Sequence, residues 1–159
     1  MNYKIEEYNH LAKEFKRLDL DISSSIIFLP ENLEESKSKE DFIFSDSVSD
    51  IEKIFRENNV PFSQLGGYSD QYRIRKNADW WGPALYFGAS MLSENTTVVS
   101  IALNVLSNYL TDFFKGSFSE KKVKIEIYVE ERKNVKFKRI IFEGSAEEIK
   151  ELEKIIKAL

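Results

Sequence analysis

The sequence predicts an α+β protein with about five strands in a mostly antiparallel sheet and about five helices. Three observations predict this class: short apolar runs bounded by proline and polar residues, a central stretch nearly free of charge, and a C-terminal pair of alternating segments followed by an amphipathic one. The chain has 159 residues, which is the size of one ordinary domain. We therefore expect a single domain over residues 1–159.

The N-terminal part predicts a helix followed by two strands. Residues 3–18 place apolar side chains three and four positions apart, which is typical of an amphipathic helix. Residues 25–29 and 42–44 are short apolar runs of the length expected for buried strands. The polar residues between these two runs are expected to form a solvated loop.

A second helix and a third strand follow. The helix is expected over residues 49–58, opened by a capping box in which Glu52 reaches back to Ser49. Residues 71–75 alternate between apolar and cationic side chains, so they predict a strand with Ile74 on its inner side.

The central stretch predicts a pair of apolar helices at residues 79–92 and 96–114, separated by Glu94 and Asn95, with Asn95 as the N-cap of the second. The second helix is apolar around most of its circumference, apart from one narrow stripe of small polar residues. Such a helix must be covered on most sides. We expect it to lie at the centre of the core.

The C-terminal part predicts a β-hairpin and a final helix. Residues 123–129 alternate cleanly, whereas the pattern slips in the second strand, so we expect a bulge near Lys138. The final helix is expected to open with a capping box of Ser145 and Glu148. Its buried face consists of Ile149, Leu152, Ile155, Ile156 and Leu159.

Composition excludes several classes of function. The absence of cysteine removes disulfides and thiolate chemistry and favours a cytoplasmic protein. A net charge of −4 argues against nucleic-acid binding, and the apolar runs are shorter than the ~20 residues that a membrane helix needs. No nucleotide, zinc or hydrolase motif is present, and His10 has no orienting partner nearby. We therefore expect no catalytic residue, metal ligand or cofactor.

The polar stripe of the second central helix has three readings. It lines a solvent-facing gap, an interface between copies of the chain, or a ligand pocket. Small uncharged side chains allow close approach of two helices without burying a charge. The interface hypothesis rests on Ser100, Asn104, Ser107, Asn108 and Thr111.

A second cluster combines cations with large aromatic side chains. Arg73 and Arg75 precede Asp79, Trp80 and Trp81, a combination that can hold a nucleotide, another small ligand or single-stranded nucleic acid. The competing interpretation is a solvated strand face beside a buried aromatic anchor. We expect a non-enzymatic cytosolic interaction or regulatory module whose partner is a second copy of itself. The alternative is a small-molecule or nucleotide-binding enzyme with a cleft near Arg73, Arg75 and Asp79, and nucleic-acid binding is a second alternative.

Overall fold

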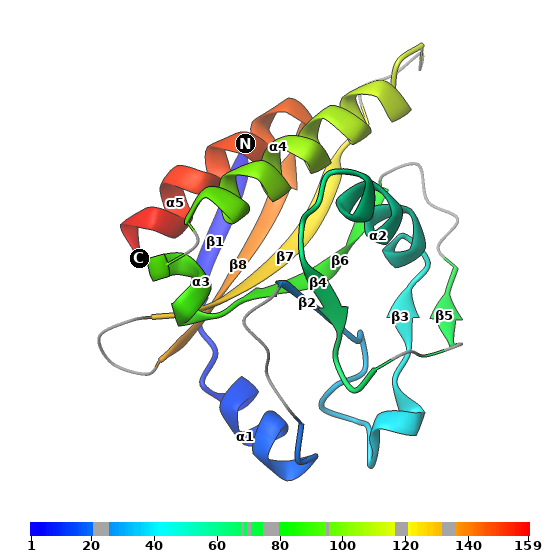
Figure 1. Cartoon of the computed structure of the whole chain (residues 1–159), viewed down its shortest axis with the longest axis vertical. Coiled ribbons are helices and arrows are strands. Elements are labelled where there is room, and N and C mark those ends of the chain that lie inside the picture. Colours follow the sequence, from blue (N-terminus) through cyan, green and yellow to red (C-terminus); the bar gives the residue numbers. More distant parts are fainter. Residues whose placement is uncertain are drawn as a thin grey trace.

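The computed structural model describes residues 1–20, 26–67, 69, 71–74, 80–94, 96–116, 121–131 and 136–159. Within these ranges, the buried hydrophobic side chains form one core. The fold is α+β, as predicted, with helices packed on a mixed sheet (Figure 1).

The strands, in chain order, are β1 (Asn2–Glu7), β2 (Ile26–Leu29), β3 (Phe44–Ser45), β4 (Phe62–Gln64), β5 (Tyr72–Arg73), β6 (Trp80–Phe87), β7 (Val123–Glu130) and β8 (Phe137–Gly144). The helices are α1 (His10–Arg17), α2 (Val48–Glu57), α3 (Ala89–Glu94), α4 (Thr96–Phe113) and α5 (Leu152–Ala158), with short 3-10 helices η1 (Lys39–Asp41) and η2 (Glu147–Glu151). In the described part of the chain, the main sheet has six strands in the order β1-β8-β7-β6-β2-β4, and β3 pairs with β5 separately. Within the main sheet, the β6–β7 and β2–β4 pairings are parallel. The β1–β8, β7–β8 and β2–β6 pairings are antiparallel.

One face of the main sheet is apolar and is covered by α2, α4 and α5 (Figure 1). On β7, the side chains of Ile125, Ile127 and Val129 point to this face, because neighbouring residues of a strand alternate. Phe28 of β2 shares the face and stacks on Phe55 of α2, with ring centroids 6.0 Å apart. This helix-covered face holds the core that the alternating pattern predicts.

The opposite face is covered at one end only. There Phe15 of α1 meets the rings of Tyr86 and Phe137 edge-on, at 5.6 and 6.4 Å between centroids. Beyond α1, β7 presents Lys124, Glu126 and Tyr128 on the same face. We call this side the open face of the sheet.

Several predicted elements are confirmed. The second central helix is α4, and the C-terminal hairpin is β7 and β8. At the final helix, the backbone N–H of Ser145 donates to Glu148 at 3.0 Å, and the N–H of Glu148 donates to the Ser145 hydroxyl at 3.3 Å. The capping box is therefore formed, although the helix opens with the 3-10 turn η2.

The predicted helix over residues 3–18 is wrong in its first half. Asn2–Glu7 is strand β1, which pairs antiparallel with β8, and only His10–Arg17 is helical. Burial explains the error, because Ile5 is 38% exposed whereas Leu11 and Phe15 are buried. The apparent helical stripe combined two elements that pack in different places.

The predicted helix over residues 79–92 is also wrong. Trp80–Phe87 is strand β6, and helix α3 is confined to Ala89–Glu94. Since β6 lies between β7 and β2 with both faces largely covered, it is apolar on both sides and shows no alternation. A strand of this kind cannot be distinguished from a buried helix by its pattern alone.

The predicted bulge near Lys138 is not formed. The β7–β8 register runs without a shift from Val123 opposite Gly144 to Glu130 opposite Phe137. The pattern slips because Phe137 is buried under α1 on the open face, whereas Ile140 lies on the helix-covered face. An irregularity lies instead in the β6–β7 pairing, between Trp81 and Ala84.

Two smaller predictions also fail. The N-cap of α2 is Ser47, so the capping box of Ser49 is absent, and Glu52 is buried and accepts a hydrogen bond from Gln64. The third strand shrinks to β5 and lies outside the main sheet, which leaves Ile74 73% exposed.

Candidate functional site

A cleft of about 470 Å³ lies on the open face of the sheet, beyond the end of α1. Its floor comes from β6, β7 and β8, and its walls come from Tyr8, α1 and the segment after β2. The lining residues are Tyr8, Leu11, Leu29, Pro30, Glu31, Leu33, Glu34, Glu35, Trp81, Gly82, Ala84, Lys124, Ile125, Glu126, Tyr128, Arg139, Ile141, Phe142 and Glu143. A cleft of this volume accommodates a small organic molecule.

Arg139 is the central cation of the cleft floor. Its Nε donates to Glu6 of β1 at 2.9 Å, and a second guanidinium nitrogen contacts the same carboxylate. Burial alone would lower the pKa of Arg139, but its hydrogen bonds with Glu6 and Tyr128 outweigh burial and raise it. The hydrogen bond from Arg139 is also the main cause that lowers the pKa of Glu6. The two side chains are therefore held charged and in place.

Two tyrosines flank this arginine. The guanidinium lies over the Tyr8 ring, 4.7 Å from its centroid, and the rings of Tyr8 and Tyr128 meet edge-on at 5.4 Å. The Tyr128 hydroxyl donates to Glu126 at 3.0 Å. Burial, together with the carboxylate that each hydroxyl contacts, raises the pKa of both tyrosines. Both hydroxyls therefore remain neutral donors at physiological pH.

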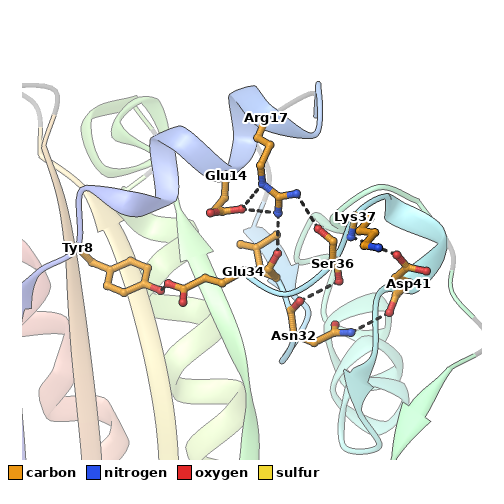
Figure 2. Close-up of polar contacts among 9 residues, drawn as sticks. Tyr8, Glu14, Arg17, Asn32, Glu34, Ser36, Lys37 and Asp41 are labelled. Carbon is orange, nitrogen blue, oxygen red and sulfur yellow. Dashed lines mark hydrogen bonds and ion pairs between the residues drawn. The ribbon is translucent and has the colours of Figure 1, made fainter.

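The outer wall is tied to α1 by hydrogen bonds. Figure 2 shows Tyr8 pointing to Glu34 and Arg17 of α1 reaching the segment after β2. Arg17 Nη1 donates to the carbonyl of Ser36 at 2.7 Å, and Arg17 Nη2 donates to the carbonyl of Leu33 at 3.2 Å. The side chain of Asn32, near the start of this segment, donates to the carbonyl of Asp41, in η1, at 2.8 Å. The wall is thus held against both α1 and η1.

The other end of the cleft carries a second pairing of cation and ring. Lys124 Nζ lies 4.6 Å from the centroid of the Trp81 ring. Trp81 and Lys124 are opposed on the parallel strands β6 and β7, so the sheet register brings them together. Each cation of the floor therefore covers an aromatic ring of the protein itself.

Acidic groups dominate the lining. Among the described residues it holds five carboxylates, from glutamates 31, 34, 35, 126 and 143, and two cationic side chains. Both cations are already placed against rings, and Arg139 is also paired with Glu6. Two of the carboxylates are paired as well, Glu31 with Arg73 and Glu143 with Lys122, so the lining keeps a modest excess of negative charge.

The residues of the predicted ligand cluster are separated by the fold. Trp81 lines the cleft, whereas Trp80 pairs with Val123 and belongs to the opposite face. Arg73 is exposed on β5 and reaches the cleft wall only through an ion pair with Glu31 at 3.3 Å. Arg75 and Asp79 lie outside the described residues.

The predicted interface stripe of α4 divides into two groups. Ser107 is buried and donates to the carbonyl of Ala146 at 2.8 Å, Ser100 contacts Glu153 of α5, and Thr111 donates to the carbonyl of Ser107 at 2.8 Å. Asn104 and Asn108 are exposed. Two of the five residues, Ser100 and Ser107, thus join α4 to the C-terminal segment, Thr111 bonds within α4, and the interface stays a prediction.

Sequence reasoning missed the residues that build the cleft, above all Tyr8, Glu126, Tyr128 and Arg139. Tyr8 was assigned to a helix stripe, and the other three were assigned to the outer side of the hairpin. A signal existed, since β7 carries a tyrosine among its outward-facing residues and β8 an arginine. Their meeting with Tyr8 depends on the pairing of β1 with β8 across the whole chain.

Metal-binding groups and membrane-spanning helices are absent from the described residues. No group of three or more histidine, aspartate or glutamate side chains there is placed to hold a metal ion. Every helix there is too short or too polar to cross a lipid bilayer. His10 is exposed and meets the Tyr8 ring edge-on at 6.0 Å.

In comparisons with known proteins, the chain matches no family model, no curated protein and no solved structure.

Proposed function

We propose that the protein binds a small, positively charged organic ligand, such as a diamine or a guanidine, in the cleft on the open face of the sheet. The observation that carries this proposal is the lining itself: a 470 Å³ cleft in which carboxylates outnumber cations beside aromatic rings. Binding sites for small molecules commonly combine apolar walls with a few fixed polar groups.

The polar network supports the proposal because contacts within the protein hold the wall and floor of the cleft in place. Arg139 is held by Glu6, and Tyr8 is held by Glu34, so neither side chain has to move far to form the cleft. A site that is already ordered loses little conformational entropy when it binds. A ligand ammonium group would pair with carboxylates of the rim, where a partly covered cleft strengthens charge pairing relative to open water.

The same lining disfavours the nucleotide alternative. Phosphate groups would meet five carboxylates, and the two cations of the cleft are already engaged by the protein. Repulsion between like charges opposes such binding. The proposed ligand therefore binds in a different cleft from the predicted one, shares only Trp81 with the described residues of the predicted cluster, and has the opposite charge to a nucleotide.

Calorimetric titration tests the proposal with matched probes. Cadaverine, spermidine and arginine are expected to bind, whereas glutarate and adenosine triphosphate are not. Glu126→Gln keeps an acceptor for the Tyr128 hydroxyl but removes a charge, so affinity for the cationic probes should fall about tenfold. Glu57→Gln is the control, because Glu57 is exposed on α2 at the other face of the sheet. Preferential binding of the anions, or an equal loss in both variants, would contradict the proposal.

Self-association is the second candidate function. The observation that favours it is not the stripe of α4 but the free edge of strand β1, which carries the inference below.

A further inference from the structure

Strand β1 forms an open edge of the main sheet. In the described part of the chain it pairs with β8 and has no neighbour on its other side. Tyr3 is 50% exposed and Ile5 is 38% exposed, and both lie on the same face of the strand. An edge of this kind presents unpaired backbone groups that another strand can bind.

The register identifies the backbone groups that face outward. The N–H of Tyr8 donates to the carbonyl of Phe137 at 2.8 Å, just beyond the end of β1. In an antiparallel ladder, residues that exchange hydrogen bonds alternate with residues that do not. Counting back in twos, Glu6 and Lys4 bond to β8. The backbone N–H and C=O groups of Tyr3, Ile5 and Glu7 therefore point to the open edge.

We propose that two copies of the chain pair antiparallel through β1, about a two-fold axis at Ile5, and so form one continuous sheet. Such an axis, normal to the sheet, keeps equivalent faces together. Tyr3, Ile5 and Glu7 then bond to Glu7, Ile5 and Tyr3 of the partner subunit. Every outward-facing group within β1 gains a partner in this register.

Charge complementarity selects this register over its neighbours. With Ile5 opposite Ile5 of the partner subunit, Lys4 faces Glu6 of the partner subunit, and symmetry repeats the pair. A shift by two residues in one direction places Lys4 opposite Lys4 of the partner subunit. A shift in the other direction places Glu6 opposite Glu6 of the partner subunit. Opposite charges across a strand pair are stabilising and like charges are destabilising, so both shifts are disfavoured.

The charges of β1 are compatible with this role. Charged residues on an edge strand usually prevent pairing. Here Lys4 and Glu6 already lie 3.5 Å apart within one strand, and Lys4 is 72% exposed and able to turn toward a partner. The charge pattern is therefore complementary to itself under two-fold symmetry. The dimer stands independently of the ligand proposed for the cleft.

Cysteine cross-linking tests the dimer and its register together. The chain has no cysteine, so a single introduced thiol reports one position. Ile5→Cys should form an intermolecular disulfide on mild oxidation, because opposed residues of a hydrogen-bonded pair have Cα atoms ~5.5 Å apart, a distance that a disulfide spans. Tyr3→Cys alone should not cross-link, but a mixture of Tyr3→Cys and Glu7→Cys should give the mixed dimer.

Native mass spectrometry of the unmodified chain supplies the second readout. A dimer is expected, and Lys4→Glu should weaken it about tenfold while leaving the melting temperature of the monomer unchanged, since Lys4 is exposed. A chain that remains monomeric at high protein concentration would overturn the proposal. Cross-linking of Tyr3→Cys alone as efficient as that of Ile5→Cys would overturn it as well.

Discussion

The two faces of the main sheet differ in chemistry although the same strands build both. On the helix-covered face, Ile127 of β7 and Ile140 of β8 are opposed and fully buried. Their neighbours in the sequence, Tyr128 and Arg139, are opposed on the open face and line the cleft. Alternation along a strand thus assigns stability to one face and binding chemistry to the other.

The difference teaches how a small protein obtains a cleft. The long helix α4, together with α2 and α5, covers most of one face and leaves Tyr3 and Ile5 of the edge strand exposed there, whereas α1 is short and covers only the end of the other face (Figure 1). The uncovered part must then be filled by side chains that tolerate both water and burial. Tyrosine, tryptophan and arginine meet that need because each combines a large apolar surface with a polar end.

The largest expected effect is the loss of packing on the helix-covered face. Ile127→Ala removes buried methyl groups at a fully buried position and should cost about 2–5 kcal/mol in the free energy of unfolding, measured by urea denaturation. Ile141→Ala is the matched control on the open face, where the side chain is only partly buried. Its cost should be less than half as large. Equal losses would mean that the cleft floor is as tightly packed as the core.

The second expected effect is the resistance of the open-face tyrosines to alkali. The pKa values of Tyr8, Tyr86 and Tyr128 are raised above 10, by burial and then by a contacting glutamate. Neutral tyrosine is thus favoured in the folded state, so the stability that these residues contribute is present below about pH 10 and is lost as the pH rises further. Absorbance at 295 nm should show these three tyrosines, together with Tyr109, whose pKa is also raised by burial, ionising only at higher pH or on unfolding. Glu126→Gln should lower the pKa of Tyr128 most and that of Tyr8 less, because the Glu126 charge raises both.

A smaller effect is expected on α4. Ser107→Ala leaves the carbonyl of Ala146 with only the longer hydrogen bond from the N–H of Ile149, at 3.4 Å, and should cost about 1 kcal/mol in the free energy of unfolding. Asn104→Ala, at an exposed position of the same stripe, should stay within about 0.5 kcal/mol. Asn104→Lys also tests the interface predicted for α4, since it should lower the native mass only if that stripe joins two copies.

The smallest effect is expected at the capping box. Hydrogen bonds from the backbone N–H of Ser145, from the N-terminal ammonium group and from the Ser145 hydroxyl together lower the pKa of Glu148 to about 2, from an ordinary value of 4.5, and Ser145→Ala removes the last of them. Its contribution to stability is therefore present above about pH 4.5 and is lost as the pH falls toward 2. Carbon-13 NMR titration should show this low pKa, and Ser145→Ala should raise it. An unchanged pKa in Ser145→Ala would contradict the capping role.

The local sequence pattern correctly predicted the elements whose burial in the fold follows that pattern. The periodicity of the sequence predicts helix α4 and strand β7, and the spacing of Ser145 and Glu148 predicts the capping box. The failures occur where tertiary contacts dominate. Strand β6 lies between two other strands, so it is apolar on both faces and its period vanishes. Phe137 interrupts the alternation of β8 because α1 covers it from the open face.

The cleft shows even more clearly that tertiary contacts decide what the local sequence pattern does not predict. Among the described residues of the predicted ligand cluster, Trp81 lines it, because the sequence placed the tryptophans close to Arg73 and Arg75 but gave no information about which strand β6 would join. Glu6 and Arg139 stand at opposite ends of the chain and meet only because β1 pairs with β8. Pairing of distant strands is a property of the whole fold, and no local window contains it.

The sequence by itself therefore determined the fold class, the long helix, the hairpin and the capped C-terminal helix, because these depend on residues within one or two turns of each other. Only the tertiary structure decided that the first segment is a strand, that β6 is the centre of the sheet, and that tyrosines and carboxylates gather on its open face. The physical reason is that burial is assigned by the partner elements. A side chain that alternates outward becomes part of a site only when another segment of the chain covers one end of that face.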